Sequence, residues 1–271
     1  MATFYLDERE IPFQEGQTIL DAAMTGGHYI PHLCWRPELE PHSSCRLCTV
    51  QISGRPFSSC TQPALKDQRV ECDTPELIAM RRAVTQMLFV EGNHYCPSCE
   101  RSGGCKLQAT AYYLGMQDSH FPHQFPIRER DSSHPAVNLD RDRCIRCEVC
   151  VRASRALDGK NVFGIHGRGI ESRLAVNSPT GLLKDSSVSA DDAAVKLCPT
   201  GALTVKRIGF ARPIGARPYD LEPINLLELR EYRTSRAGPP DHEVGGPGGD
   251  VASEASRRSP SDKHQGEGAH A

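Results

Sequence analysis

The chain of 271 residues contains 12 cysteines, and eleven of these fall into three groups with the close spacing of metal ligands. Cysteines at such density form either disulfides in an oxidising compartment or metal sites in a reducing one. The first residues, MATFYLDEREIPF, show no basic stretch followed by an apolar one, and no apolar run approaches the length of a membrane span. We therefore expect a cytoplasmic metal-binding protein.

The apolar content is thin for one large hydrophobic core. Hydrophobic residues make up 38% of the chain and aromatic residues only 6%. Small modules that depend on bound metal for their stability are therefore expected. The formal net charge of −2 indicates neither a nucleic-acid-binding surface nor a polybasic membrane patch.

The first cysteine group, called the first site below, has ten, two and eleven residues between its members Cys34, Cys45, Cys48 and Cys60. A 2Fe–2S cluster takes four thiolates from a loop that wraps it, and a close pair of cysteines can bind one edge. The alternative is a four-cysteine zinc site, which usually has two close pairs. Only one pair is close here, and the surrounding segments are rich in β-forming residues, so a 2Fe–2S cluster is favoured.

The second group contains only three cysteines, Cys96, Cys99 and Cys105, which can hold three irons of a 4Fe–4S cluster. His94 lies two residues before Cys96 and is the nearest candidate for the fourth ligand; these four residues form the second site. The alternative fourth ligand is the one remaining cysteine, Cys72, which a predicted helix separates from the group. A neutral imidazole in place of a thiolate should raise the potential of a cluster.

The third group, the third site, consists of three evenly spaced cysteines and a distant fourth that precedes a proline: Cys144, Cys147, Cys150 and Cys198. This is the pattern of bacterial 4Fe–4S ferredoxins. Because 47 residues separate Cys150 from Cys198, we expect the module to hold one cluster. The count predicts one 2Fe–2S and two 4Fe–4S clusters on twelve ligands, with Cys72 as a buried small apolar residue.

The predicted fold is α+β, and the segments differ in pattern along the chain. They are an N-terminal β-grasp 2Fe–2S ferredoxin-like domain (1–73), a small helical 4Fe–4S module with one-histidine, three-cysteine ligation (74–115), a linker (116–135), a bacterial-ferredoxin-like 4Fe–4S domain (136–210), an extension (211–233) and a tail (234–271). The tail has almost no large apolar residue, so it is expected to be disordered.

The order of these motifs resembles the N-terminal region of the large iron–sulfur subunit of respiratory NADH dehydrogenase (complex I). The short spacing in HYCPSCE and the ending VKRIGFARPIGARPYD are more similar to the small diaphorase subunit of soluble, bidirectional NAD-reducing nickel–iron hydrogenases. The resemblance covers roughly residues 1–225. It implies two partners, a flavin-containing NADH-binding diaphorase subunit and the hydrogenase small and large subunits, which the extension is expected to contact.

Functionally, the resemblance implies a subunit that relays electrons between NAD(H) and H2 chemistry carried out by its partners. No glycine-rich GxGxxG motif follows a strand, so no nicotinamide site and no catalytic residue are expected in this chain. Two alternatives stay open: a subunit of an NAD-linked formate dehydrogenase or complex-I-like enzyme, and a zinc-stabilised scaffold without redox function.

Overall fold

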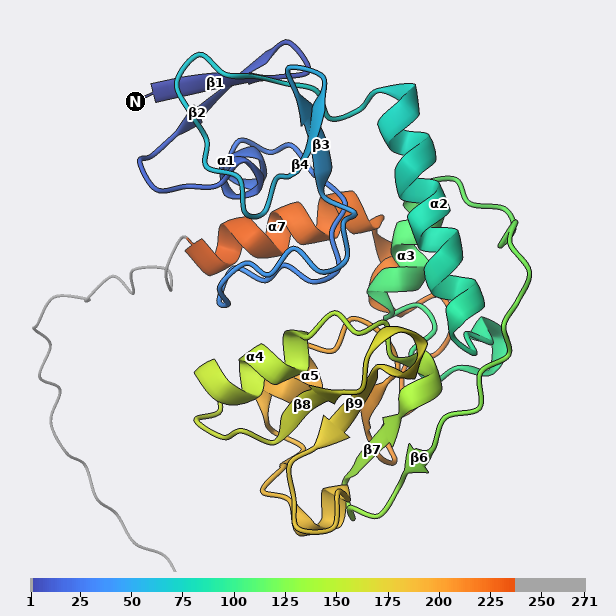
Figure 1. The fold of residues 1–271 in the computed structure, drawn as a ribbon. Helices are drawn as coiled ribbons and strands as arrows, with labels where there is room; N and C mark the ends of the chain where they lie inside the picture. The colour runs from blue at the N-terminus through green and yellow to red at the C-terminus, as the bar shows by residue number, and fades with distance from the viewer. Residues whose placement is uncertain (1, 237–271) are drawn as a thin grey trace, which may run out of the picture. The chain divides into compact units, whose positions relative to one another are not determined.

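The computed structural model describes residues 2–236, which form one unit (Figure 1). Its first part is a mixed sheet. Strands β1 (Ala2–Leu6) and β2 (Arg9–Phe13) form an antiparallel hairpin, and β5 (Arg69–Val70) pairs in parallel with β1. The hairpin of β3 (Thr49–Ile52) and β4 (Arg55–Ser58) is joined to this sheet by a bridge between Gln51 and Glu71. The first part therefore combines a mixed three-stranded sheet with a separate two-stranded hairpin.

Helix α1 (Ile19–Thr25) packs against this sheet because one face of it is apolar. Its first turn is fixed by a capping box, in which Thr18 accepts from the Asp21 N–H and the Asp21 carboxylate accepts from the Thr18 N–H. The long loop between α1 and β3 contains Cys34 and Cys45, and it leaves the sheet toward the rest of the unit.

The middle part is helical, as predicted. Helix α2 (Pro75–Glu91) begins at the Thr74 cap, whose hydroxyl accepts from the Leu77 N–H, and it ends before Gly92. A short 3₁₀ turn (Cys96–Ser98) and helix α3 (Lys106–Tyr113) follow. An extended segment then leads to β6 (Arg130–Asp131), so the predicted linker of 116–135 contains one short strand.

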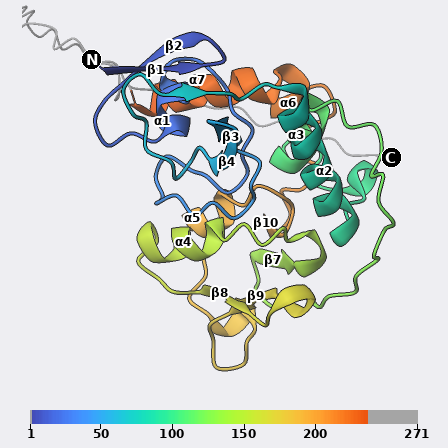
Figure 2. The same ribbon diagram turned by 45° about the horizontal axis from the view of Figure 1, so that its top comes forward.

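The third part has a sheet in the order β10-β7-β6, built from β6, β7 (Val137–Asp140) and β10 (Leu203–Val205). A second antiparallel pair consists of β8 (Phe163–His166) and β9 (Arg173–Val176). Helices α4 (Val149–Ala156) and α5 (Ala193–Lys196) contact each other beside these strands (Figure 2). The apolar core of this part includes Phe163, Val137 and Leu139.

The extension returns to the first domain. After the short helix α6 (Pro218–Leu221), helix α7 (Ile224–Arg236) packs against α1 and α3, and Ile224 and Tyr232 join the apolar core of the N-terminal domain. The helix continues past residue 233, where the extension was expected to end. The predicted disordered tail otherwise lies outside the described residues. No helix within residues 2–236 has the length and apolarity needed to cross a membrane.

Candidate metal centres

The first site lies on the loops on either side of β3 and β4. Cys34, Cys48 and Cys60 are buried and Cys45 is half-buried. Two backbone N–H groups point at sulfur: Leu33 donates to the Cys45 sulfur and Cys45 donates to the Cys34 sulfur, both at 3.4 Å. Ser43 and Arg46 have left-handed backbone conformations, with φ of 59° and 60°, which let the loop curl around its own thiols.

This hydrogen bonding favours the charged form of two thiols. A hydrogen bond from Cys45, followed by backbone N–H groups and the Arg152 charge, lowers the pKa of Cys34 to about 5 despite burial. A hydrogen bond from Cys60 likewise lowers the pKa of Cys48. Thiolates are the form in which cysteine binds iron. The same hydrogen bonds, together with burial, raise the pKa of the donors Cys45 and Cys60, so each pair holds one proton and all four thiolates require a cationic cofactor beside them.

The second site is a cavity after the end of α2. It is bordered by all four predicted ligands together with five neighbours: His94, Cys96, Cys99, Cys105, Tyr95, Ser102, Gln108, Arg143 and Gly201. Cys72 does not border it. That cysteine contacts Arg81 and the Asp7 carboxylate near β5 instead. The structure thus places His94, and not Cys72, beside the three thiols.

The surroundings of the His94 imidazole keep it in the neutral form that can bind a metal ion. Burial, and then the nearby Arg143 charge, lowers the pKa of His94 to about 4, so the ring is neutral near pH 7. Its Nε2 is buried and has no hydrogen-bond partner among residues 2–236. Gly92 makes room for the ring, because a Cβ at Gly92 would lie 2.4 Å from His94 Nε2. A neutral, buried imidazole with an unpaired nitrogen fits a metal ligand.

The third site lies where the loop after β7 meets the Cys198–Pro199 segment. Its cavity is bordered by all four cysteines and by apolar side chains such as Ile145, Ile165 and Leu174. Arg146 and Glu148, which stand before and after Cys147, both have left-handed conformations. They turn the short loop so that its three cysteines face one cavity.

Burial makes free thiols at the second and third sites hard to ionise. It raises the pKa of Cys105 to about 12 and that of Cys144 to about 11, and it also raises the pKa of Cys147 and Cys150. Buried thiolates need a positive charge beside them. The irons of a cluster would supply it, so both donor sets fit such a group.

The spacing of the ligand atoms can be compared with that of a mononuclear zinc site. Four sulfurs around one zinc ion, with Zn–S bonds of about 2.3 Å, stand roughly 3.8 Å apart. Within residues 2–236, the one group of three or more His, Cys or carboxylate ligand atoms within 4.8 Å of one another is Asp7, His28, Cys72 and Asp73. That group lies outside all three sites, so within none of these sites, which all lie in the described range, do three ligand atoms lie inside 4.8 Å of one another.

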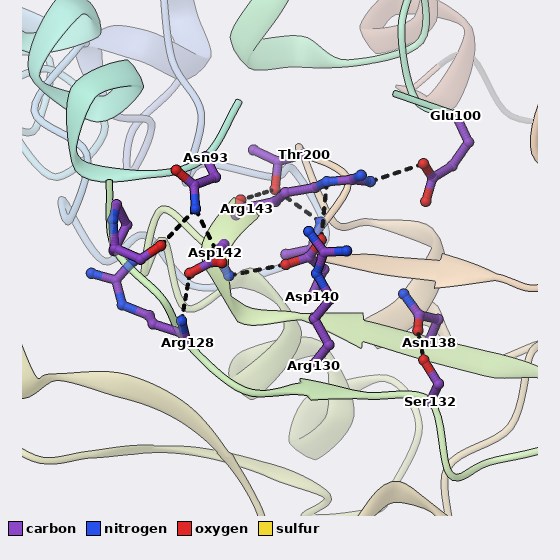
Figure 3. Close-up of polar contacts among 12 residues, drawn as sticks. Asn93, Glu100, Arg128, Arg130, Ser132, Asn138, Asp140, Asp142, Arg143 and Thr200 are labelled. Carbon is purple, nitrogen blue, oxygen red and sulfur yellow. Dashed lines mark hydrogen bonds and ion pairs between the residues drawn. The ribbon is translucent and has the colours of Figure 1, made fainter. Parts of the chain in front are cut away.

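A polar network joins the second and third sites (Figure 3). The Asp142 carboxylate accepts from the Asn93 side chain at 3.2 Å and from the Arg128 N–H at 2.8 Å, and the Asp142 carbonyl accepts from the Asn93 N–H at 2.9 Å. Asn93 precedes His94, and Asp142 lies two residues before Cys144. The network therefore fixes the backbone next to His94 against the backbone next to Cys144, so it connects a predicted ligand of the second site to one of the third.

Arg143 continues this network. Its guanidinium pairs with Glu100 at 2.9 Å and with Asp140 at 3.1 Å, while its carbonyl accepts from the Thr200 hydroxyl at 2.8 Å. Glu100 follows Cys99, and Thr200 lies two residues after Cys198. The Asp140 pair is local in sequence, but Glu100 and Thr200 could not be identified from spacing, because their contacts with Arg143 join distant parts of the chain.

The first and third sites also touch directly. The Ser44 hydroxyl donates to the Arg146 carbonyl at 3.1 Å, and Arg152 donates to the Cys34 carbonyl. Cys34 shares one apolar cluster with Cys147, Cys150 and Cys198. The first and second sites are joined through apolar contacts, in a cluster that contains Leu33, Leu47, Leu107 and Cys105.

Three family models match successive parts of the chain. They are described as a 2Fe-2S iron-sulfur cluster binding domain (residues 1–75), the NADH-ubiquinone oxidoreductase-G iron-sulfur binding region (81–120) and the ferredoxin-like domain of NADH-quinone oxidoreductase subunit 3 (134–204). The chain therefore carries both 2Fe–2S and 4Fe–4S binding domains in an α+β fold.

Curated relatives differ in how much of their length the chain covers. It is 28% identical to the NADH-ubiquinone oxidoreductase 75 kDa subunit of Reclinomonas americana over 85% of this chain, but spans only 33% of that protein. It is also 30% identical to the alpha subunit of the NADPH-Fe(3+) oxidoreductase of Geobacter sulfurreducens, over 78% of this chain and 25% of that protein.

Two further matches extend over nearly the whole of the related chain. In a crystal structure of NAD+-reducing [NiFe]-hydrogenase in the H2-reduced state, one chain matches with a TM-score of 0.82 and 50% identity, covering 85% of this chain and 98% of that one. The gamma subunit of the NAD-reducing hydrogenase HoxS of Cupriavidus necator is 39% identical over 83% of this chain and 95% of its own length. This chain belongs to the family of gamma subunits of NAD-reducing hydrogenases.

Proposed function

We propose that this chain relays electrons between a flavin-containing, NADH-binding diaphorase subunit and a hydrogenase module, in the reversible conversion of H2 and NAD+ to NADH and H+. The observation that carries the proposal is the gathering of three sulfur-rich ligand sets in one unit, joined by direct contacts between their loops. The chemistry of bond making belongs to the partners, and no residue of this chain is assigned a catalytic role.

The ligand assignment we propose is that of twelve side chains. A 2Fe–2S cluster takes Cys34, Cys45, Cys48 and Cys60; one 4Fe–4S cluster takes His94, Cys96, Cys99 and Cys105; the other takes Cys144, Cys147, Cys150 and Cys198. These clusters would supply one-electron redox chemistry. The protein's own part is to bury the ligands, point N–H groups at sulfur and hold the sites close together.

We further infer the order in which the sites exchange electrons. Loops of the third site bind loops of both others: Arg101 donates to the Cys198 carbonyl at 3.3 Å, and Ser44 donates to the Arg146 carbonyl. The Lys106 N–H, next to Cys105, donates to the Pro199 carbonyl at 2.9 Å. The third site, although last in sequence, is thus proposed as the intermediate between the first and second.

The extent of similarity favours a hydrogenase over complex I, and the assay below separates a hydrogenase from a formate dehydrogenase. The chain spans nearly all of the hydrogenase gamma subunit but at most a third of the other two relatives described. The test is anaerobic purification of the chain with the proteins that bind it, followed by assay of the complex for H2-dependent reduction of NAD+. A complex that reduces NAD+ with formate instead, or zinc in place of iron, would reject the proposal.

A further inference from the structure

A buried arginine lies beside the first site. Arg81 is on α2 and its side chain is 1% exposed. Its Nε donates to the Leu47 carbonyl at 3.0 Å, and one terminal nitrogen donates to the Thr49 carbonyl at 2.8 Å. The other terminal nitrogen donates to the Cys72 carbonyl at 2.8 Å. The planar guanidinium is thus fixed by three backbone groups.

Two of these carbonyls flank a proposed ligand. Leu47 precedes Cys48 and Thr49 follows it, so Arg81 holds the chain on both sides of that cysteine. The Cys48 carbonyl accepts from the N–H and the hydroxyl of Ser59, at 3.1 and 2.7 Å, which fixes the residue before Cys60. The backbone that presents Cys48 therefore depends on Arg81 from one side and on Ser59 from the other.

The charge of Arg81 is only partly balanced by carboxylates. Asp73 lies 3.5 Å from Arg81, but its side chain is 43% exposed. The Cys72 sulfur, 3.3 Å from the guanidinium, is a neutral thiol because burial raises the pKa of Cys72 to about 12. A buried charge is costly unless it is paired. Thiolate ligands and the electron that a cluster accepts would provide the missing negative charge.

The neighbouring group of Asp7, His28, Cys72 and Asp73 does not need a metal ion to explain it. Arg81 already places a cation against Cys72 and Asp73. Both Asp7 oxygens accept backbone N–H groups, from Cys72 at 2.7 Å and from Asp73 at 3.1 Å. A second cation there would be repelled by the guanidinium.

We propose that Arg81 is a positioning residue of the first site, which fixes the backbone around Cys48 and raises the reduction potential of the 2Fe–2S cluster through its buried positive charge. This inference rests on the proposed function, because it requires that Cys34, Cys45, Cys48 and Cys60 hold that cluster. A positive charge nearby stabilises the reduced form, which carries one more electron.

The test is redox titration of the full chain, loaded with clusters and followed by the electron paramagnetic resonance signal of each cluster. Arg81→Met should make reduction of the 2Fe–2S cluster at least tenfold less favourable, which lowers its potential by 59 mV or more for one electron. Both 4Fe–4S potentials should stay unchanged. Arg81→Lys, which keeps the charge, should recover most of that shift. The matched control is Arg82→Met, whose half-buried guanidinium donates to the Leu114 carbonyl away from the first site.

The outcomes separate this inference from the proposed function. A wild-type chain without a 2Fe–2S signal rejects the proposed function itself. A wild-type signal whose potential is the same in Arg81→Met rejects only the role of Arg81. Where Arg81→Met does not accumulate, Arg81→Lys decides by the rate at which a chelator removes the 2Fe–2S iron. Loss at least several times faster than in Arg82→Met supports the proposal, and equal rates overturn it.

Discussion

At the scale of single residues, the contacts of His94 give the most specific prediction about a cluster ligand. Its ring packs against Phe89 with centroids 5.4 Å apart, and it borders the same cavity as three thiols. We predict that His94→Cys retains the second cluster and lowers its potential, because a thiolate adds one negative charge at iron. Cys72→Ala should leave that potential unchanged. An unaltered second-cluster spectrum in His94→Cys, with loss of the cluster in Cys72→Ala, would show that Cys72 is the ligand.

Gly92 is the residue that lets His94 fold back against the end of α2. A Cβ there would stand 2.4 Å from His94 Nε2 and 2.7 Å from the Asp142 carbonyl. We predict that Gly92→Ala displaces the ring and reduces iron at the second site, measured as loss of its 4Fe–4S signal. Gly54→Ala is the comparison, since that turn has open space but a left-handed φ of 72°. Equal 4Fe–4S signals in the two variants would contradict the role given to Gly92.

At the scale of elements, α7 acts as a brace for the first domain. Tyr232 packs against Trp35, next to Cys34, with ring centroids 5.6 Å apart, and its hydroxyl donates to the Asp21 carbonyl. Near it, Glu228 forms a buried ion pair with Lys106 at 2.6 Å. Although burial acts against it, Lys106 and His32 hold the pKa of Glu228 well below its usual range. The helix thus connects the first domain to α3 through both apolar and charged contacts.

Removal of the Tyr232 ring tests this brace. Tyr232 is 4% exposed, and truncating a buried aromatic residue to alanine costs about 3 kcal/mol or more. We predict that Tyr232→Ala lowers the free energy of unfolding of the cluster-loaded chain by that amount, measured with denaturant. Leu226→Ala on the same helix should cost less than about 0.5 kcal/mol, because Leu226 is 51% exposed. A cost for Tyr232→Ala as small as that for Leu226→Ala would mean that the Tyr232 contacts do not stabilise the domain.

The elements also show what local sequence can predict. Helix α2 was predictable at both ends, because Thr74, Pro75 and Gly92 are local signals that need no partner. Helix α7 was not predicted, because its few apolar residues stand among charged ones and give no clear helical pattern. Their role is visible only in the folded chain, where Ile224 and Tyr232 pack into the core of the first domain. The same holds for Asn93 and Arg81: the cysteine spacing identifies the candidate ligands, but the groups that hold them come from distant segments.

At the scale of the whole unit, the three sites form one contact network in which each site touches both of the others. Spacing suffices to group the candidate ligands, because most candidates of one site lie on one loop, and the cavities of the second and third sites bring their four candidates together. It could not predict that the Cys198–Pro199 segment lies against both Arg101 and Lys106, since such contacts depend on how the domains pack. The position of the third site therefore became apparent only in the folded chain.

Because we propose the third site as the intermediate between the other two, a variant that lacks its cluster tests the proposed relay. Cys147 is buried in the third-site cavity, and a serine hydroxyl there would be far less acidic than a thiol and a poorer ligand for iron. We predict that Cys147→Ser lowers the iron content from about ten atoms to roughly six. The signals of the first and second clusters should remain.

Electron exchange between the remaining two clusters should slow strongly in this variant, because the intermediate between them is gone. The measurement is rapid freezing after partial reduction, which follows how fast the first and second clusters come to equilibrium. Cys72→Ser is the matched control, since Cys72 lies outside all three sites and should leave iron content and exchange unchanged. Exchange in Cys147→Ser as fast as in the control would show that electrons pass directly through the apolar contacts around Leu33 and Leu107.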